Sequence, residues 1–315
     1  MKLLPLAIVP FRNLPVPDLR PVPPSDHLFS ELVVRLVAID NTGGLHSFGT
    51  AFVFQPYLAL TAKHVIEEFA KLDPSLYTGE MVSFNFWAIQ IAWEGEEHRY
   101  IVWEVRFISL SGHSDLAILK LHPYDENAAK YTMWKGVPCT LIPPKVGDSI
   151  IGFGVHDITF AGSRVNAEGK VEHIELNDKA SSSRGVVKAV YPLYRDLCML
   201  PIPCFEVDAQ FEGGMSGGLV INERSQVCGI VCSSLPATEE HPIPTSFVAM
   251  LWPIMAMKID FSLFTTAPVS GEQYILELAR HGVFAPEGWE HVVIEENPAG
   301  PGCKVSMQGP THHST

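Results

Sequence analysis

Positive charge is scarce in this sequence. The 315 residues include 22 Lys and Arg against 35 Asp and Glu, which gives a formal net charge of −13 at pH 7. A protein that binds nucleic acid through its phosphates needs a basic surface. The balance therefore argues against a nucleic-acid partner. Long apolar runs are also missing, since no stretch reaches the ~18 uninterrupted apolar residues of a membrane span. No membrane-embedded segment is expected.

Cysteines at disulfide or metal-ligand spacing are lacking as well. Cys228 and Cys232 fall on one expected strand, where four residues at ~3.3 Å each hold them ~13 Å apart, too far for a bridge. Cys228 and Cys232 also lack a second cysteine pair at the spacing of metal ligands. The other four cysteines are Cys139, Cys198, Cys204 and Cys303. Buried free thiols are typical of a reducing compartment. No metal or cofactor is predicted.

The N-terminus offers only a faint secretion signal. Residues 3–9 are apolar after Lys2, but Pro5 and Pro10 interrupt the run and no small-x-small cleavage site follows. Together with the thiols, this favours a cytoplasmic location over secretion.

Helical periodicity is scarce too, and short β-rich runs separated by turn residues dominate from residue 31 onward. Such density predicts an all-β sandwich or a pair of barrels. Two segments look helical: residues 63–72, and a late segment with Ser270 as N-cap and Gly282 after its last turn. The last twenty residues, with His312 and His313, are expected to be disordered, and these histidines are not read as metal ligands.

Glycine is concentrated around one hydroxyl, in the segment FEGGMSGGLVI at residues 211–221. Glycine is retained where φ is positive or where a group must approach the backbone closely. Ser216 is thus either a nucleophile beside exposed N–H groups or part of a plain glycine-rich turn. The segment also fits the G-x-S-x-G elbow of α/β-hydrolases. That elbow needs a helix after the serine and the order Ser, acid, His. Here a strand hairpin follows, so the elbow reading fails.

A base and an acid lie upstream of Ser216 instead. His64 stands where an apolar strand gives way to a short helix, and Asp115 follows a Gly-Ser turn just before another apolar strand. A carboxylate at that position can orient a histidine, which can then take the proton of a serine. Alone, each residue is more often a surface or turn residue. The order His, Asp, Ser makes a shared role the better interpretation.

These segments resemble the chymotrypsin/trypsin-like serine proteases, of the bacterial, disulfide-free type. LTAKHV, SDLAILKL and GGMSGG match the family's His, Asp and Ser motifs, and His64 precedes Asp115 by 51 positions while Asp115 precedes Ser216 by 101. The resemblance implies two antiparallel six-stranded β-barrels with the active site in the cleft between them. It implies an N-terminal arm (1–29), a first barrel (30–135), a second barrel (136–258), and a C-terminal helix and tail (259–315).

The resemblance also implies a serine endopeptidase acting on a protein or peptide substrate. His64 is the general base, Asp115 orients it and Ser216 is the nucleophile. The N–H groups of Gly214 and Ser216 form the oxyanion hole. The implied substrate-binding residues are Gln210, Cys232, Ser233 and Ser234.

The sequence departs from the secreted trypsins in ways that bear on function. Met215 replaces the aspartate that pairs with a new N-terminal amine, so activation by N-terminal cleavage is not expected. Gln210 is neutral where trypsin carries its specificity aspartate, which predicts cleavage after apolar rather than basic residues. A regulatory protein partner remains open. The alternative function is a catalytically silent module of the same fold that binds peptides or proteins.

Overall fold

The computed structural model describes most of the chain. The described residues are 18–21, 31–39, 44–72, 77–78, 81–82, 86–94, 97–131, 136–165, 171–239, 242–261, 270–297 and 302–308. The apolar run at residues 3–9 and the histidines His312 and His313 lie outside them. Within the described part, no helix is long and apolar enough to cross a membrane.

The first barrel is built from runs rich in β-branched and aromatic residues, which suit pleated, half-buried surfaces. Its six strands are β2 (Val33–Ile39), β3 (Leu45–Gln55), β4 (Leu58–Thr61), β7 (Phe86–Glu94), β8 (Glu97–Leu110) and β9 (Ala117–Pro123). They follow the order β8-β7-β2-β3-β4-β9, and antiparallel pairing of β8 with β9 closes the barrel. β5 (Tyr77–Thr78) and β6 (Met81–Val82) extend the sheet beyond β8.

Two helices accompany this barrel. α2 (Lys63–Leu72) follows β4 and buries Val65, Ile66 and Phe69 against the core. α3 (Glu126–Lys130) follows β9, and its first turn is capped by the side chain of Asp125.

The second barrel has the same closed design. Its strands are β10 (Ser149–Val165), β11 (Val171–Tyr191), β12 (Cys204–Val207), β13 (Leu219–Asn222), β14 (Val227–Leu235) and β15 (Thr245–Met250). Pairing of β11 with β12 closes the order β11-β10-β13-β14-β15-β12. β1 (Asp18–Pro21) adds an antiparallel strand beside β11, so part of the N-terminal arm belongs to this sheet. The double six-stranded, all-β architecture is the one that the sequence predicts.

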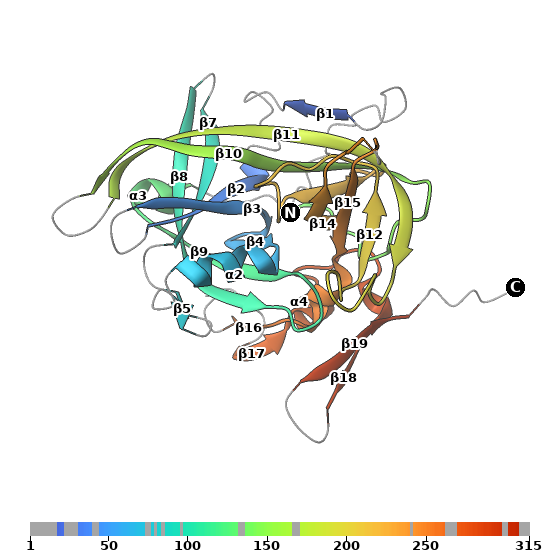
Figure 1. The fold of residues 1–315 in the computed structure, drawn as a ribbon. Coiled ribbons are helices and arrows are strands. Elements are labelled where there is room, and N and C mark those ends of the chain that lie inside the picture. Colours follow the sequence, from blue (N-terminus) through green and yellow to red (C-terminus); the bar gives the residue numbers. More distant parts are fainter. Residues whose placement is uncertain are drawn as a thin grey trace, which may run out of the picture.

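The hairpin of β10 and β11 is much longer than the barrel needs. Figure 1 shows it running from the second barrel across the top of the first. There Phe160 and Ile174 pack against a cluster that includes Trp87 and Ile89 on β7. The buried guanidinium of Arg35 on β2 pairs with Asp178 of the hairpin. One hairpin thus ties the two barrels together.

The C-terminal region is more ordered than the sequence predicts. Its elements are η3 (Trp252–Ala256), β16 (Lys258–Asp260), β17 (Glu272–Tyr274), α4 (Ile275–Arg280), η5 (Trp289–His291), β18 (Val292–Glu296) and β19 (Cys303–Met307).

Two expectations for this region are wrong. The late helix does not begin after Ser270, because Glu272–Tyr274 pairs with β16, and Tyr274 occupies the N-cap position without a side-chain capping bond. Gly282 does follow the helix in a left-handed conformation, with φ of 69°. Residues 303–307 are not disordered, because they pair with β18 and their side chains Val305 and Met307 pack against the core.

Candidate active site

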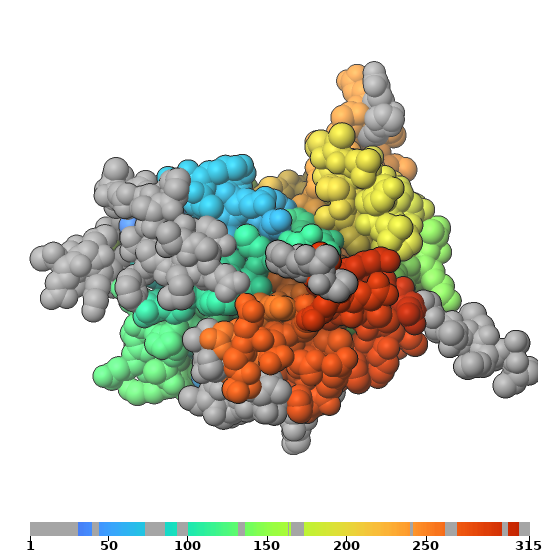
Figure 2. Space-filling view, turned by 90° about the horizontal axis from the view of Figure 1, so that it is seen from below, coloured from blue at the N-terminus to red at the C-terminus, as the bar shows by residue number. Residues whose placement is uncertain are grey.

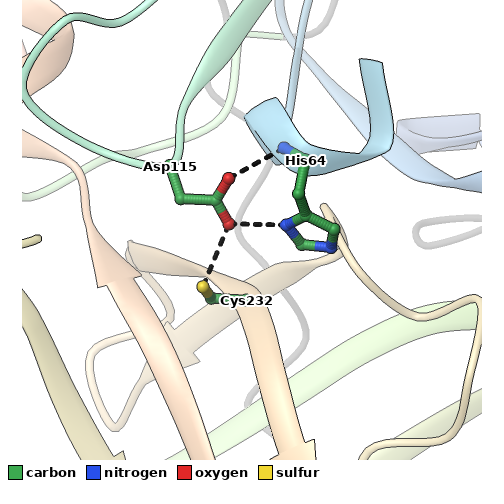
Figure 3. A group of neighbouring side chains, drawn as sticks. All are labelled: His64, Asp115 and Cys232. Atoms are coloured by element: carbon green, nitrogen blue, oxygen red, sulfur yellow. Dashed lines mark hydrogen bonds and ion pairs between the residues drawn. The ribbon is translucent and has the colours of Figure 1, made fainter. Parts of the chain in front are cut away.

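His64 and Asp115 meet at the first turn of α2. β4 ends at Thr61, α2 begins at Lys63, and Asp115 lies in the connection between β8 and β9. One carboxylate oxygen, Oδ1, accepts the backbone N–H of His64 at 2.9 Å, and the other, Oδ2, lies 2.7 Å from His64 Nδ1. A carboxylate is favoured at this position because the first N–H groups of a helix lack partners and carry partial positive charge. Two hydrogen bonds therefore fix the histidine relative to Asp115 (Figure 3).

Cys232 completes this group from the second barrel. Its thiol donates a hydrogen bond to Asp115 Oδ2 at 3.0 Å, and Figure 3 shows the carboxylate between the cysteine on its strand and the histidine on its helix. Burial and the charge of Asp115 raise the pKa of the Cys232 thiol well above its ordinary value. Cys232 is therefore a neutral donor. The sequence predicts a substrate-binding role for it and carries no signal of a contact with Asp115, 117 positions away.

The imidazole of His64 is partly exposed, with 40% of its side chain accessible, whereas the side chain of Asp115 is 13% exposed. Burial disfavours the charged imidazolium. The hydrogen bond to Asp115, the charge of Asp115 and the charges of Glu67 and Glu68 outweigh this, and they raise the pKa of His64 above 6.5. An imidazole of this kind can take up a proton and hold the resulting charge.

His64, Asp115 and Cys232 are also residue types that bind metal ions, and their ligand atoms lie within 4.8 Å of one another. Ligands at Zn²⁺ distances of about 2.0–2.3 Å in tetrahedral geometry stand roughly 3.3–3.6 Å apart. The separations of 2.7 Å and 3.0 Å from Asp115 Oδ2 are hydrogen-bond distances instead. The group fits a hydrogen-bonded set better than a metal centre.

The turn around Ser216 has the backbone geometry that its glycines predict. Gly214 has φ of 102° and Gly217 has φ of 83°, a region that other residues enter at a cost. Met215 is fully buried, and its sulfur accepts the N–H of Glu212 at 3.3 Å. Met215 therefore anchors the turn in the second barrel by packing, without a charged partner.

The same turn docks on the first barrel. The N–H of Thr50 on β3 donates to the carbonyl of Ser216 at 2.9 Å, and the Thr50 hydroxyl donates to the carbonyl of Gly214 at 2.8 Å. A Cβ atom on Gly217 would lie 2.1 Å from the Thr50 carbonyl and 3.0 Å from the N–H nitrogen of Ala62. Ala62 stands two positions before His64. The serine turn and the histidine are thus held on adjoining parts of one interface.

Two features of this interface bear on chemistry. Among the described residues, no hydrogen bond joins Ser216 Oγ to His64 Nε2. Within the same ranges, no acceptor takes the N–H groups of Gly214 and Ser216. The N–H groups predicted to form an oxyanion hole are consequently available to a ligand.

The predicted substrate-binding residues separate into two groups. Cys232 and Ser233 line a cavity of about 540 Å³ that also contains His64 and Asp115. Gln210 and Ser234 are not among its lining residues. The amide of Gln210 donates to Glu212, and the hydroxyl of Ser234 is paired with that of Ser246 on β15.

Comparison with known proteins places the chain in a family. A family model described as a trypsin-like peptidase domain matches residues 49–230, more than half of the sequence. The chain belongs to the trypsin-like peptidase family. The matched range contains His64, Asp115 and Ser216, and it ends two positions before Cys232. No curated protein matches this trypsin-like peptidase in sequence.

Solved structures of similar fold are proteases of low sequence identity. The active form of the Rv3671c protease from M. tuberculosis is 20% identical, with a TM-score of 0.39, and the match covers 78% of this chain and 89% of that one. Deg5 is 17% identical, with a TM-score of 0.43 and coverage of 75% and 90%. A serine endoprotease from Yersinia pestis is 15% identical, with a TM-score of 0.39 and coverage of 70% and 59%.

Proposed function

We propose that this trypsin-like peptidase is a serine endopeptidase that uses His64, Asp115 and Ser216 as its catalytic triad. The observation that carries the proposal is the doubly hydrogen-bonded Asp115–His64 pair at the interface where the Ser216 turn docks. Family membership supports it, because the matched range includes all three residues.

The proposed reaction is acyl transfer in two halves. Ser216 Oγ attacks the carbonyl carbon of the scissile peptide bond while its proton passes to His64 Nε2. Asp115 holds the proton on Nδ1 and stabilises the imidazolium. His64 then gives its proton to the leaving amine as the carbon–nitrogen bond breaks. Water, deprotonated by His64, attacks the acyl-enzyme, and the proton returns to Ser216 as the ester bond breaks.

The tetrahedral oxyanion of each half needs donors that are already in place. The N–H groups of Gly214 and Ser216 are the proposed donors, and each such donor contributes about 2.7–4 kcal/mol to transition-state stabilisation. The positive φ of Gly214 and the buried Met215 support this role because they set the direction of the backbone in the turn.

The alternative function is a binding module of the same fold. It is favoured by the lack of a Ser216–His64 hydrogen bond within the described residues. Catalytic hydrogen bonds in unliganded enzymes are often long and tighten only with substrate, so this observation does not decide against catalysis.

Covalent labelling separates the two functions. We expect a fluorophosphonate probe to add to Ser216 of the full-length chain and to leave Ser216→Ala unlabelled. His64→Ala should lose labelling and peptidase activity almost as completely, with kcat falling by about 10⁶-fold in either variant. Ser114→Ala, in the same loop as Asp115, is the matched serine control and should label normally. An unlabelled wild-type chain with a normal melting temperature would leave the binding module as the function.

A further inference from the structure

A further cavity, of about 460 Å³, lies where the C-terminal elements pack on the first barrel. One side is the end of β8 and the loop that leads to Asp115, which contributes Gly112 and His113. The other sides are β16, β17 and the facing ends of β18 and β19. The hydroxyl of Ser109 on β8 donates to the carbonyl of Lys258 on β16 at 2.8 Å and ties the two sides together. Figure 2 shows these C-terminal elements in orange and red, beside the blue-green and green segments of the first barrel.

Two cross-strand pairs supply the polar side chains of this cavity. Glu296 and Cys303 are opposite one another on β18 and β19. Lys258 and Tyr274 are opposite one another on β16 and β17, and the ammonium lies 4.8 Å from the ring centre. The hydroxyl of Tyr274 donates to the carboxylate of Glu296 at 3.2 Å. A cavity of this size suits a small molecule, and walls that carry both signs of charge suit a zwitterionic one.

His113 and Cys303 meet in this cavity, although 190 positions separate them in the chain. His113 Nε2 lies 3.5 Å from Cys303 Sγ, within hydrogen-bond range for sulfur. A histidine at this distance can take the proton of the thiol, and the thiolate is the nucleophilic form of cysteine. The hydroxyl of Tyr274 also bonds to Cys303. Burial and the charges of Cys303 and Glu296 raise the pKa of Tyr274 to about 12, so this hydroxyl stays protonated and can donate to the sulfur. Cys303 thus has a base and a donor beside it.

The remaining cysteines are in different surroundings. Four are buried: Cys139, Cys204, Cys228 and Cys232. Burial raises the pKa of Cys139 and Cys228 to about 12, which leaves them as unreactive thiols. Cys198 is exposed, and its turn is built around the carboxylate of Asp196 rather than a histidine. Among the thiols that the structure describes, partial exposure and a contacting histidine coincide at Cys303.

His113 belongs to the loop that carries Asp115. The backbone N–H of His113 donates to the hydroxyl of Ser111 at 3.1 Å. The N–H of Ser111 donates to the carbonyl of Leu116 at 2.9 Å and closes the loop over residues 111–116. A group attached to Cys303 would occupy the space beside the His113 ring. Because the loop is closed on itself, a displaced His113 shifts Asp115 with it.

We propose that Cys303 is a site of reversible thiolation, with His113 as its base and a small zwitterionic disulfide as the reagent. Resting on the proposed peptidase function, the attached group lowers activity by displacing the loop of His113 and Asp115. In the reaction, the Cys303 proton passes to His113 Nε2 and the thiolate attacks one sulfur of the disulfide. The new S–S bond forms as the bond of the reagent breaks. Cys303 is oxidised, and the departing thiol is reduced and takes the proton from His113. Exchange with a free thiol reverses the step.

The thiolation is tested with oxidised glutathione on the full-length chain, and mass spectrometry follows each cysteine separately. Cys198 is the internal control, because it is the more exposed thiol. We expect Cys303 to react about 10-fold or more faster than Cys198, and to fall to the rate of Cys198 in His113→Gln. Equal rates in the wild type would overturn the proposal, as would an unchanged Cys303 rate in His113→Gln. The wild-type comparison needs no substitution, and melting temperatures check the fold of the variant.

The effect on the candidate triad is measured in Cys198→Ser, so that Cys303 is the thiol that reacts. The matched control is Cys198→Ser with Cys303→Ser, treated identically. We expect thiolation to slow fluorophosphonate labelling of Ser216 by about 10-fold or more, since a small displacement of the triad is costly, and dithiothreitol to restore the rate. The control should keep its rate throughout. An unchanged rate in the thiolated chain would overturn the proposal.

Failure of the proposed peptidase function is recognised separately, because the mass measurement needs no activity. A reduced chain that never labels at Ser216 counts against the peptidase function alone. In that case the NMR signal of the His64 ring, which is hydrogen-bonded to Asp115, reports on the loop. A signal that moves on thiolation of Cys303 supports the proposal, and a signal that stays in place overturns it.

Discussion

Asp115 satisfies three donors at once: the backbone N–H of His64, the imidazole Nδ1–H and the thiol of Cys232. With both oxygens engaged, the carboxylate has one orientation, and His64 has one ring position. The thiol remains protonated because its pKa is raised, so it supports the carboxylate without competing for protons. Three residues from two barrels thereby act as one hydrogen-bonded unit.

At the residue scale, the raised pKa of His64 predicts how activity depends on pH. Catalysis needs neutral His64, so kcat/KM should rise with pH and reach half of its plateau above pH 6.5, because the pKa of His64 is raised. Asp115→Asn should lower kcat by about 10⁴-fold and move the midpoint toward acid, since the main groups raising this pKa are gone. The pH profile and the NMR titration of the His64 ring measure both shifts.

The pH dependence of stability has the opposite sign to that of activity. Because the folded-state pKa of His64 lies above its unfolded value, the charged ring contributes stability that is complete below about pH 6.5 and is lost as pH rises through the folded-state pKa. If the midpoint of the kcat/KM profile lay at or below pH 6.5 and did not move in Asp115→Asn, Asp115 would not be the group that raises the pKa of His64.

At the scale of elements, the serine turn is shaped by where it must fit. Gly217 is pressed against the Thr50 carbonyl and the Thr61 hydroxyl, where a Cβ atom would approach to 2.1 Å and 2.2 Å. Gly213, four positions earlier, has nothing within 4 Å of its Cβ position. Substitutions at Gly217 and Gly213 therefore distinguish the effect of tight docking from the effect of losing a glycine's backbone flexibility.

This contrast gives the element-scale prediction. Gly217→Ala should destabilise the protein by about 1–3 kcal/mol through overpacking and lower kcat by about 10²-fold, because the turn must move away from β3. Gly213→Ala is the matched control and should stay close to the wild type in both measurements. Urea denaturation and steady-state kinetics provide the readouts. Equal effects of the two substitutions would mean that docking against Thr50 does not position the turn.

At the scale of the whole molecule, the β10–β11 hairpin joins the barrels. Asp178 of the hairpin pairs with Arg35, a side chain of β2 that is only 2% exposed. Breaking such a buried pair leaves a charge without its partner, which is much more costly than losing a surface pair.

Asp178→Asn should therefore lower the free energy of unfolding by about 3–5 kcal/mol. Asp157→Asn is the matched control. It removes a carboxylate of the same hairpin that pairs with exposed Lys179 and is itself 57% exposed, and it should change stability by less than about 1 kcal/mol. Chemical denaturation followed by tryptophan fluorescence measures both. Similar small effects would show that the hairpin is not a structural tie between the barrels.

The sequence by itself determined the features that depend on local spacing. Alternating apolar runs bounded by turn residues predict the strands of the first barrel, and glycines flanking Ser216 predict a turn with positive φ. The order of His64, Asp115 and Ser216 in family-like segments predicts the fold and the candidate triad. The pairing of His64 with Asp115 follows from that prediction and is present in the structure.

Tertiary structure alone decided the features that depend on contacts between distant segments. Residues 155–184 are largely polar and give no strong strand signal, yet most of them form strands because they pair with each other and cover the first barrel. The strand at residues 303–307 exists because β18 lies beside it. Cys232 reaches Asp115 only when two closed barrels meet. Local propensity is set by neighbours in sequence, whereas these contacts are set by which surfaces the folded barrels bury against each other.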